Sequence, residues 1–290
     1  GSTVRRATLH NVDELGRLNL RMGQRVFIEK GGDVIPKVVA VVPGEPEDLP
    51  RPEIPTACPE CGGAVGKTDE EEVAIRCLNP DCPAKLAARF LHFGSRSALD
   101  IEGLGEALVD QLVPSGRFRH PWELFSLLDS PLPDLEGGSP RPRGGGFRGR
   151  RSEQSEQAVP LGYLSGLAFL GGLERMAEKS ADNVLRALDQ ARTKPLARWI
   201  HALGIPMVGA KTAELLAEAY PSLEALWAAE EDRLQAVEEV GPKVAGAIRA
   251  YAVVHPDLPA QLTALGVHPV PPEKRDRSAL PLAGQVAVGT

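Results

Sequence analysis

The sequence predicts a multidomain protein in which a small β-barrel is followed by a four-cysteine metal finger and an all-α domain of helical hairpins. Three observations predict this order. Segments rich in β-branched residues occupy positions 1–45. All four cysteines lie between residues 58 and 82. From Pro83 onward, apolar residues recur at the spacing of amphipathic helices, with one interruption over 129–160.

The composition is that of an ordinary globular protein, with 42% hydrophobic and 25% charged residues. The formal net charge of −6 argues against nucleic-acid binding through a general positive field, and the 4% aromatic content argues against a stacking platform for single-stranded bases. No secretory segment opens the chain, and no apolar run approaches the roughly 18 residues of a membrane helix. We therefore expect a cytoplasmic protein with no membrane partner, and the opening Gly1-Ser2 leads us to expect a fragment.

The barrel is predicted within residues 1–45 from strand-like segments over 3–9, 24–29 and 34–42. A short helix is predicted over 12–20, because acidic residues come early in it and arginines come late. Three strands with an intervening helix fit a small barrel of the OB type.

The four cysteines form two close pairs, Cys58 with Cys61 and Cys77 with Cys82, separated by fifteen residues. In a chain without a secretory signal this clustering favours a metal over disulfides. Two such pairs can converge on one tetrahedral Zn²⁺, and four thiolates leave no open position for water, so the site is interpreted as structural. Two disulfides or four free thiols are the alternatives.

Four segments each place a tight turn between apolar residues and the start of a new helix, which makes a loose internal repeat. A glycine in such a turn brings the backbone close to a ligand, and the free amides at the next helix N-terminus suit a backbone phosphate. Contacts of this kind fix register on a duplex without reading sequence and without a positive net charge. Ordinary helical hairpins with glycine C-caps are the alternative. The segments are 101–108, 173–181, 203–213 and 237–245.

The hairpins also supply candidate DNA-contacting residues. Three of them carry glycine in the turn, and in three a lysine lies near the start of the second helix, where it can add a charge-assisted contact. These candidates are Gly103, Gly105, Lys179, Gly204, Gly209, Lys211, Gly241 and Lys243.

Taken together, these segments resemble the C-terminal half of bacterial NAD-dependent DNA ligases. The resemblance covers nearly the whole chain except 129–160, and several distinct motifs occur in the order that the family has. They lie at residues 7–11, 32–36, 58–82, 100–105, 178–181 and 202–205.

The resemblance implies a domain order for the chain. We expect an OB-like barrel, incomplete at its N-terminus, over 1–45; a linker over 46–57; a four-cysteine zinc finger over 58–83; a helix-hairpin-helix domain over 84–255 with a disordered, arginine-rich insertion over 129–160; a linker over 256–281; and the start of a truncated BRCT domain over 282–290.

The family's chemistry runs through a lysine in a Lys-x-Asp-Gly motif, which takes AMP from NAD and passes it to the 5′-phosphate of a nick. No such motif occurs in this sequence, so no catalytic residue is assigned and the chain alone is expected to be inactive. NAD and magnesium are expected to serve the full-length enzyme and not to bind this chain. The implied partners are nicked duplex DNA, met in replication and repair, and the adenylation domain.

Three further residues are barrel candidates for DNA contact by resemblance, although lone basic residues on a strand are often only a solvated face: Arg6, His10 and Lys30. The second hairpin departs from the family, because Ala177 stands where the family has glycine. Two other functions stay open, a non-catalytic DNA-binding scaffold of a repair complex and a zinc-ribbon RNA-binding protein. The barrel motif ahead of the cysteine segment favours the ligase, and the low aromatic content disfavours RNA binding.

Overall fold

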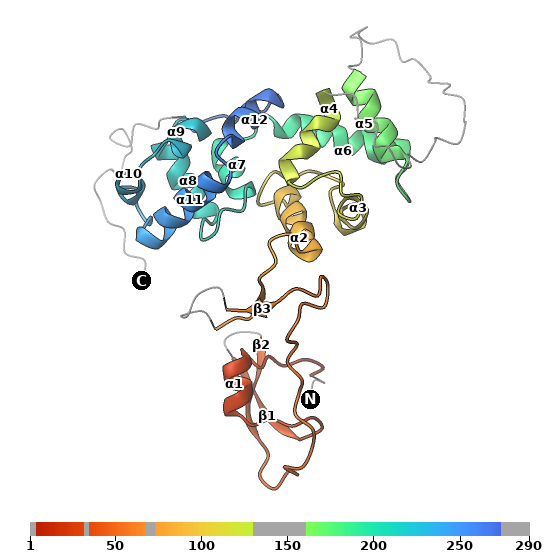
Figure 1. Cartoon of the computed structure of the whole chain (residues 1–290), viewed down its shortest axis with the longest axis vertical. Helices are drawn as coiled ribbons and strands as arrows, with labels where there is room; N and C mark the ends of the chain where they lie inside the picture. The colour runs from red at the N-terminus through yellow and green to blue at the C-terminus, as the bar shows by residue number, and fades with distance from the viewer. Residues whose placement is uncertain (1–3, 32–34, 68–72, 130–160, 274–290) are drawn as a thin grey trace, which may run out of the picture. The chain divides into compact units, whose positions relative to one another are not determined.

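The computed structural model describes residues 4–31, 35–67, 73–129 and 161–273. The chain divides into two compact units, Gly1–Lys85 and Leu86–Thr290 (Figure 1), and each is described by itself. Nearly all of the expected insertion over 129–160, and the expected domain start over 282–290, lie outside the described residues. Within the described ranges, no helix has both the length and the apolar composition needed to cross a membrane.

The barrel segment of the first unit is a two-stranded antiparallel sheet of β1 (Val26–Gly31) and β2 (Ile35–Val41), preceded by α1 (Val12–Arg17). The two strands pair from Val26 opposite Val41 to Gly31 opposite Ile35, with a bulge between Phe27 and Ile28. Both strands and the helix were expected, with ends shifted by a few residues. The sheet described in this segment consists of these two strands.

The expected strand over 3–9 is reduced to one parallel bridge, between Thr8 and Lys37. The Thr8 amide donates to the Pro36 carbonyl at 2.8 Å, and the Val38 amide donates to the Thr8 carbonyl at 3.1 Å. The pairing stops there because His10 takes a left-handed φ of 67° and turns the chain away.

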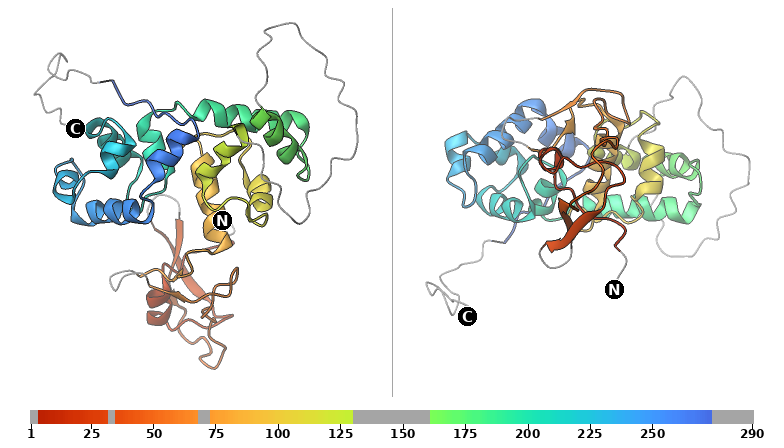
Figure 2. Two further views of the ribbon diagram at one scale, coloured as in Figure 1. Left: turned by 45° about the horizontal axis from the view of Figure 1, so that its top comes forward. Right: turned by 90° about the horizontal axis from the view of Figure 1, so that it is seen from below.

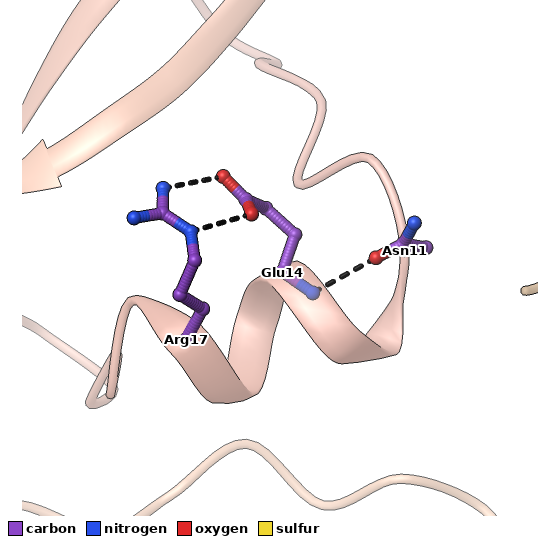
Figure 3. Close-up of polar contacts among 3 residues, drawn as sticks. All are labelled: Asn11, Glu14 and Arg17. Carbon is purple, nitrogen blue, oxygen red and sulfur yellow. Dashed lines mark hydrogen bonds and ion pairs between the residues drawn. The ribbon is translucent and has the colours of Figure 1, made fainter.

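The helix α1 is fixed by local side-chain contacts (Figure 3). The Asn11 side chain accepts from the Glu14 amide at 2.8 Å, which caps the helix. Both carboxylate oxygens of Glu14 accept from Arg17, each at 2.7 Å. The helix ends three residues before the expected Leu20, because Asn19 takes a left-handed φ of 47°.

The first unit buries little apolar surface. Among its described residues, the buried hydrophobic side chains are Val38, Cys58 and Cys82. A unit with so small a core needs a further source of stability, and two of its three buried side chains are cysteines.

The second unit is all-α, as expected, and Figure 2 shows its helices from two further sides. Its helices in chain order are α2 (Pro83–Gly94, which begins in the first unit), α3 (Glu106–Leu112), the 3₁₀ helix η1 (Pro121–Phe125), α4 (Ser126–Asp129), α5 (Leu161–Gly171), α6 (Glu178–Ala191), α7 (Leu196–Ala202), α8 (Ala210–Ala219), α9 (Leu223–Trp227), α10 (Glu231–Gln235), α11 (Pro242–Val254) and α12 (Leu258–Ala264).

The core of the helical unit is a single cluster with an aromatic centre. Phe93 lies edge-on to Trp199 at 5.8 Å and to Phe125 at 6.4 Å, measured between ring centroids. All three side chains are fully buried, and the Trp199 indole donates to the Ala191 carbonyl at 2.9 Å. Apolar side chains from α2, η1, α6 and α7 therefore meet in one core.

The expected linker over 256–281 is wrong in its first part. Helix α12 packs against α9, and Leu258, Leu262 and Val267 are each only 1% exposed. Val270 then forms a parallel bridge with Pro195. Pro259 is the second residue of α12, a position where proline is tolerated because its amide would have no partner within the helix.

Candidate metal centre and nucleic-acid interface

The four cysteines are brought together by two short turns and a two-residue ladder. The Gly62 amide donates to the Cys58 carbonyl at 2.8 Å, and Gly62 takes a left-handed φ of 68° that reverses the chain. Strand β3 (Val65–Gly66) pairs antiparallel with β4 (Arg76–Cys77), which carries the second pair back to the first. The strand that carries the second pair is short and begins at Arg76, one residue before Cys77.

The sulfur atoms form a compact group. Cys58 and Cys82 are separated by 3.9 Å between their Sγ atoms, Cys61 and Cys77 by 3.6 Å, and all four lie within 4.8 Å of one another. Four thiolates bound to one zinc at about 2.3 Å in a tetrahedron lie about 3.8 Å apart, so the donor set and its spacing fit that ion. None of the four forms a disulfide, which leaves the expected alternative of two disulfides without support.

The acidities of the thiols differ within the cluster. The Gly63 amide, followed by the Asn79 side chain, lowers the pKa of Cys61 to about 6, whereas burial raises the pKa of Cys77 to about 12. One thiolate is therefore favoured at neutral pH, and further negative charge in the same small volume is opposed. A divalent cation removes this opposition, because each sulfur then faces a positive charge.

The barrel candidates lie in different settings. Arg6 is exposed in the extended segment before the Thr8 bridge. His10 is exposed at its left-handed position, and its amide donates to the Thr8 Oγ1 at 3.0 Å. Lys30 lies in β1, paired with Pro36 in β2.

The four hairpins share one backbone geometry. In each, an amide donates to the carbonyl three residues earlier, at distances of 3.1 to 3.3 Å, and the third residue of this turn is left-handed. Two residues after that position comes an extended N-cap residue with no side-chain cap, and the second helix begins. The left-handed residues are Gly103, Arg175, Met207 and Glu239, and the N-cap residues are Gly105, Ala177, Gly209 and Gly241.

The glycines of the hairpins divide into two kinds. Gly103 has a φ of +89°, and a Cβ there would lie 2.6 Å from the Val184 Cγ2 of α6, so packing alone requires glycine. Gly204 has a φ of +65° just after α7, which is the position of a helix C-cap glycine. At both positions an ordinary structural role, without a ligand, is enough to explain the glycine.

The N-cap glycines have no such requirement. Gly105, Gly209 and Gly241 have φ between −106° and −81°, and a Cβ at each would meet nothing within 4 Å. Neither backbone strain nor packing explains glycine there. What glycine provides is an uncovered approach to the amides that open the next helix.

Ala177 takes the same extended N-cap conformation, with φ of −71° and ψ of 154°, and its side chain is exposed. The departure from glycine in the second hairpin therefore does not change the backbone. It places one methyl group in front of the same amides.

The three candidate lysines occupy one equivalent position, the second residue of the second helix. Lys179, Lys211 and Lys243 are all exposed there. Lys211 lies 3.7 Å from Glu214, with its side chain 67% exposed. The first hairpin has Ala107 at this position and therefore no cationic side chain there.

The left-handed turn positions were missed from the sequence. Three of the four are Arg175, Met207 and Glu239, which carry no glycine signal. The signal available was the spacing, since each lies two residues before the N-cap and two residues after an apolar residue.

The chain is a multidomain protein in which an OB-type segment precedes a four-cysteine finger and a run of helical hairpins. Comparisons with known proteins match each of these segments. The family model for the NAD-dependent DNA ligase OB-fold domain matches residues 1–48, and that for the NAD-dependent DNA ligase C4 zinc finger domain matches 57–84. The model for the helix-hairpin-helix motif matches 198–254.

Relatives named DNA ligase align over most of the chain. The one from Chlorobium luteolum is 43% identical over 253 residues, which cover 87% of this chain and 32% of that protein. The one from Koribacter versatilis is 41% identical with the same coverage of both chains, and the one from Alkalilimnicola ehrlichii is 40% identical over 100% of this chain and 38% of its own length. The chain is therefore similar to NAD-dependent DNA ligases over most of its length, and it spans about a third of the length of these relatives.

Proposed function

We propose that this chain is the DNA-gripping portion of a ligase that seals nicks in duplex DNA during replication and repair, in the cytoplasm. The observation that supports this most is the repeated hairpin, in which three N-cap glycines are explained neither by strain nor by packing. The order of the matched segments connects that geometry to a ligase.

The hairpins bind backbone phosphates through the amides that open α3, α8 and α11. These amides are uncharged, so the acidic chain does not need a general positive field to approach DNA. Lys211 and Lys243 add a charge-assisted contact at the same helix ends. Arg6, His10 and Lys30 contact the backbone from the barrel segment.

The four cysteines hold one structural zinc ion. When bound, zinc supplies four strong bonds that take the place of a hydrophobic core in a unit with few buried side chains. The residues that hold it are Cys58, Cys61, Cys77 and Cys82.

The adenylation step belongs to a separate domain. The sequence contains no Lys-x-Asp-Gly motif, so the chain forms no adenylated lysine and does not use NAD or magnesium by itself. Incubation with NAD followed by intact-mass measurement tests this assignment, and an added AMP would contradict it.

The test of the grip is a binding titration with nicked duplex, intact duplex and single-stranded DNA at several salt concentrations. We expect duplex to bind more tightly than single strands, tightest at a nick, with affinity falling as salt rises. The double variant Lys211→Gln/Lys243→Gln should reduce the salt slope by about 2, since each lysine neutralises about one phosphate.

Arg233→Gln is the matched control, because Arg233 is an exposed cation of α10 that lies on the first helix of its hairpin. Because the control removes one charge and the double variant removes two, a control effect half as large as that of the double variant would show that only overall charge matters. Equal affinity for all three DNA forms would contradict the duplex grip.

A non-catalytic DNA-binding scaffold is the second candidate, favoured by the absence of the lysine motif. The two are separated by supplying a ligase adenylation domain with NAD, magnesium and nicked DNA. Faster sealing when this chain is covalently joined to that domain supports the ligase, and unchanged sealing supports the scaffold.

A further inference from the structure

A pocket of about 360 Å³ opens in the helical unit among α2, η1, α7 and α11. Its volume falls in the range of small-molecule sites, which begins at roughly 300 Å³. Apart from Gly204, none of the proposed DNA-contacting residues lines it. The pocket therefore needs an explanation of its own.

One wall of the pocket is a continuous set of aromatic rings. His120 stacks on Trp122 with ring centroids 4.4 Å apart and planes inclined by 3°. His255 lies edge-on to both, at 5.1 Å and 5.4 Å, and Tyr251 lies 4.7 Å from His255. Flat ring faces and edges of this kind favour a planar aromatic ligand.

The lining carries one positive side chain and, among the residues that the structure describes, no negative one. Arg89 lines the pocket, and none of the described aspartates or glutamates does, although the chain carries a net charge of −6. Three other pockets of the helical unit each contain at least one carboxylate.

The cationic group of the pocket is available. Arg89 is exposed, and no carboxylate pairs with it in the described part of the chain. Glu123 is the acidic residue that acts on His120, and its carboxylate already accepts from the amides of Arg119 and His120. A bound anion would face the Arg89 guanidinium without a competing side chain.

We propose that this pocket binds a small planar aromatic anion, with the ring against the Trp122–His255 wall and the anionic group at Arg89. Aryl carboxylates and nucleoside monophosphates share this chemistry. The proposal concerns a site apart from the DNA grip and does not depend on it.

The test follows the histidine side-chain NMR resonances of the whole chain, without DNA, during titration with 2-naphthoate. Two comparison compounds each lack one feature of 2-naphthoate. The isostere 2-naphthamide has the aromatic ring without the negative charge, and cyclohexanecarboxylate has the negative charge without the aromatic ring. AMP and adenosine form the nucleotide arm. We expect saturable shifts for His92, His120 and His255 with 2-naphthoate or AMP, and weaker binding of the three comparison compounds.

The variant Arg89→Gln should weaken binding of the aromatic anion by about two- to fivefold, because the arginine is exposed and its charge is partly screened. The same variant should leave the affinity for 2-naphthamide unchanged. Arg96→Gln is the matched control, since Arg96 is exposed in the same unit and outside this pocket.

Tighter binding of AMP than of 2-naphthoate would assign the site to nucleotides, and the reverse would assign it to aryl carboxylates. The proposal is overturned if neither compound gives a saturable shift, if 2-naphthamide binds as well as 2-naphthoate, or if Arg89→Gln and Arg96→Gln behave alike. Because no DNA is present, such a failure leaves the proposed DNA grip untouched.

Discussion

Two glycines that lie two residues apart in the first hairpin have opposite structural requirements. Gly103 has a φ of +89° and a Cβ there would lie 2.6 Å from the Val184 Cγ2, whereas Gly105 has a φ of −106° and open space around it. We predict that Gly103→Ala destabilises the helical unit and that Gly105→Ala leaves its stability nearly unchanged.

The magnitude follows from three effects. The left-handed conformation costs about 1–2 kcal/mol for a residue with a Cβ. The overlap with Val184 costs about 1–3 kcal/mol, because a β-branched side chain in a helix has essentially one rotamer and cannot turn away. The loss of chain entropy in the unfolded state returns about 0.4–1 kcal/mol. The net destabilisation of Gly103→Ala is therefore about 1–4.6 kcal/mol.

For Gly105→Ala the same entropy gain opposes the poorer capping by alanine, which costs about 0.5–1 kcal/mol. The two nearly cancel, and the expected change is within about 1 kcal/mol. If Gly105 serves phosphate approach, this variant should instead weaken duplex DNA binding.

Urea unfolding followed by tryptophan fluorescence measures the stabilities, since all three tryptophans lie in the helical unit. The double variant Gly103→Ala/Val184→Ala tests the source of the effect. Because Val184 is itself buried, the comparison is with Val184→Ala alone, and in that background Gly103→Ala should cost less free energy of unfolding than in the unchanged chain. Equal free energies for the two glycine variants, or the same cost of Gly103→Ala in both backgrounds, would refute the assignment of Gly103 to packing.

Three further predictions concern other parts of the chain. Cys61→Ser should lower the zinc content measured by native mass spectrometry and should increase amide hydrogen exchange over 57–84. Arg198 donates to the Ala98 carbonyl at 2.5 Å and to the Arg96 carbonyl, so Arg198→Met should destabilise the helical unit by about 1–3 kcal/mol in urea unfolding. Burial lowers the pKa of His201 below 6.5, so the folded state favours the neutral ring. Stability is then full above pH 6.5 and is lost as pH falls through the lower folded pKa, and His201→Gln should reduce this loss in thermal unfolding.

The metal centre and the hairpins were predictable from the sequence for different reasons. The spacing of the cysteines predicts the metal site directly, because two close pairs of cysteines can bring four sulfur atoms to one ion and few other arrangements fit. The hairpins were predictable as repeats, because apolar residues recur around each turn. The conformation inside the turns was not, since Arg175, Met207 and Glu239 adopt left-handed backbone without a glycine to mark it.

The expected linker was wrong in its first part because local pattern does not reveal a tertiary contact. Only the burial of Leu258 and Leu262 shows that this part of the segment belongs to the helical core. The packing requirement at Gly103 could not be predicted either, because the Val184 side chain that a Cβ would meet is far away in sequence. Neither contact can be predicted from the residues that neighbour it in the sequence.

The shared turn has a consequence for engineering. Its shape is maintained by one backbone hydrogen bond, and the residues at its left-handed position include a glycine, a cation, a thioether and a carboxylate. Arg175, Met207 and Glu239 are exposed, so their side chains do not set the fold. These three positions therefore suit the attachment of dyes or spin labels. Distances between the labels would report any change in the shape of the helical unit when a ligand binds.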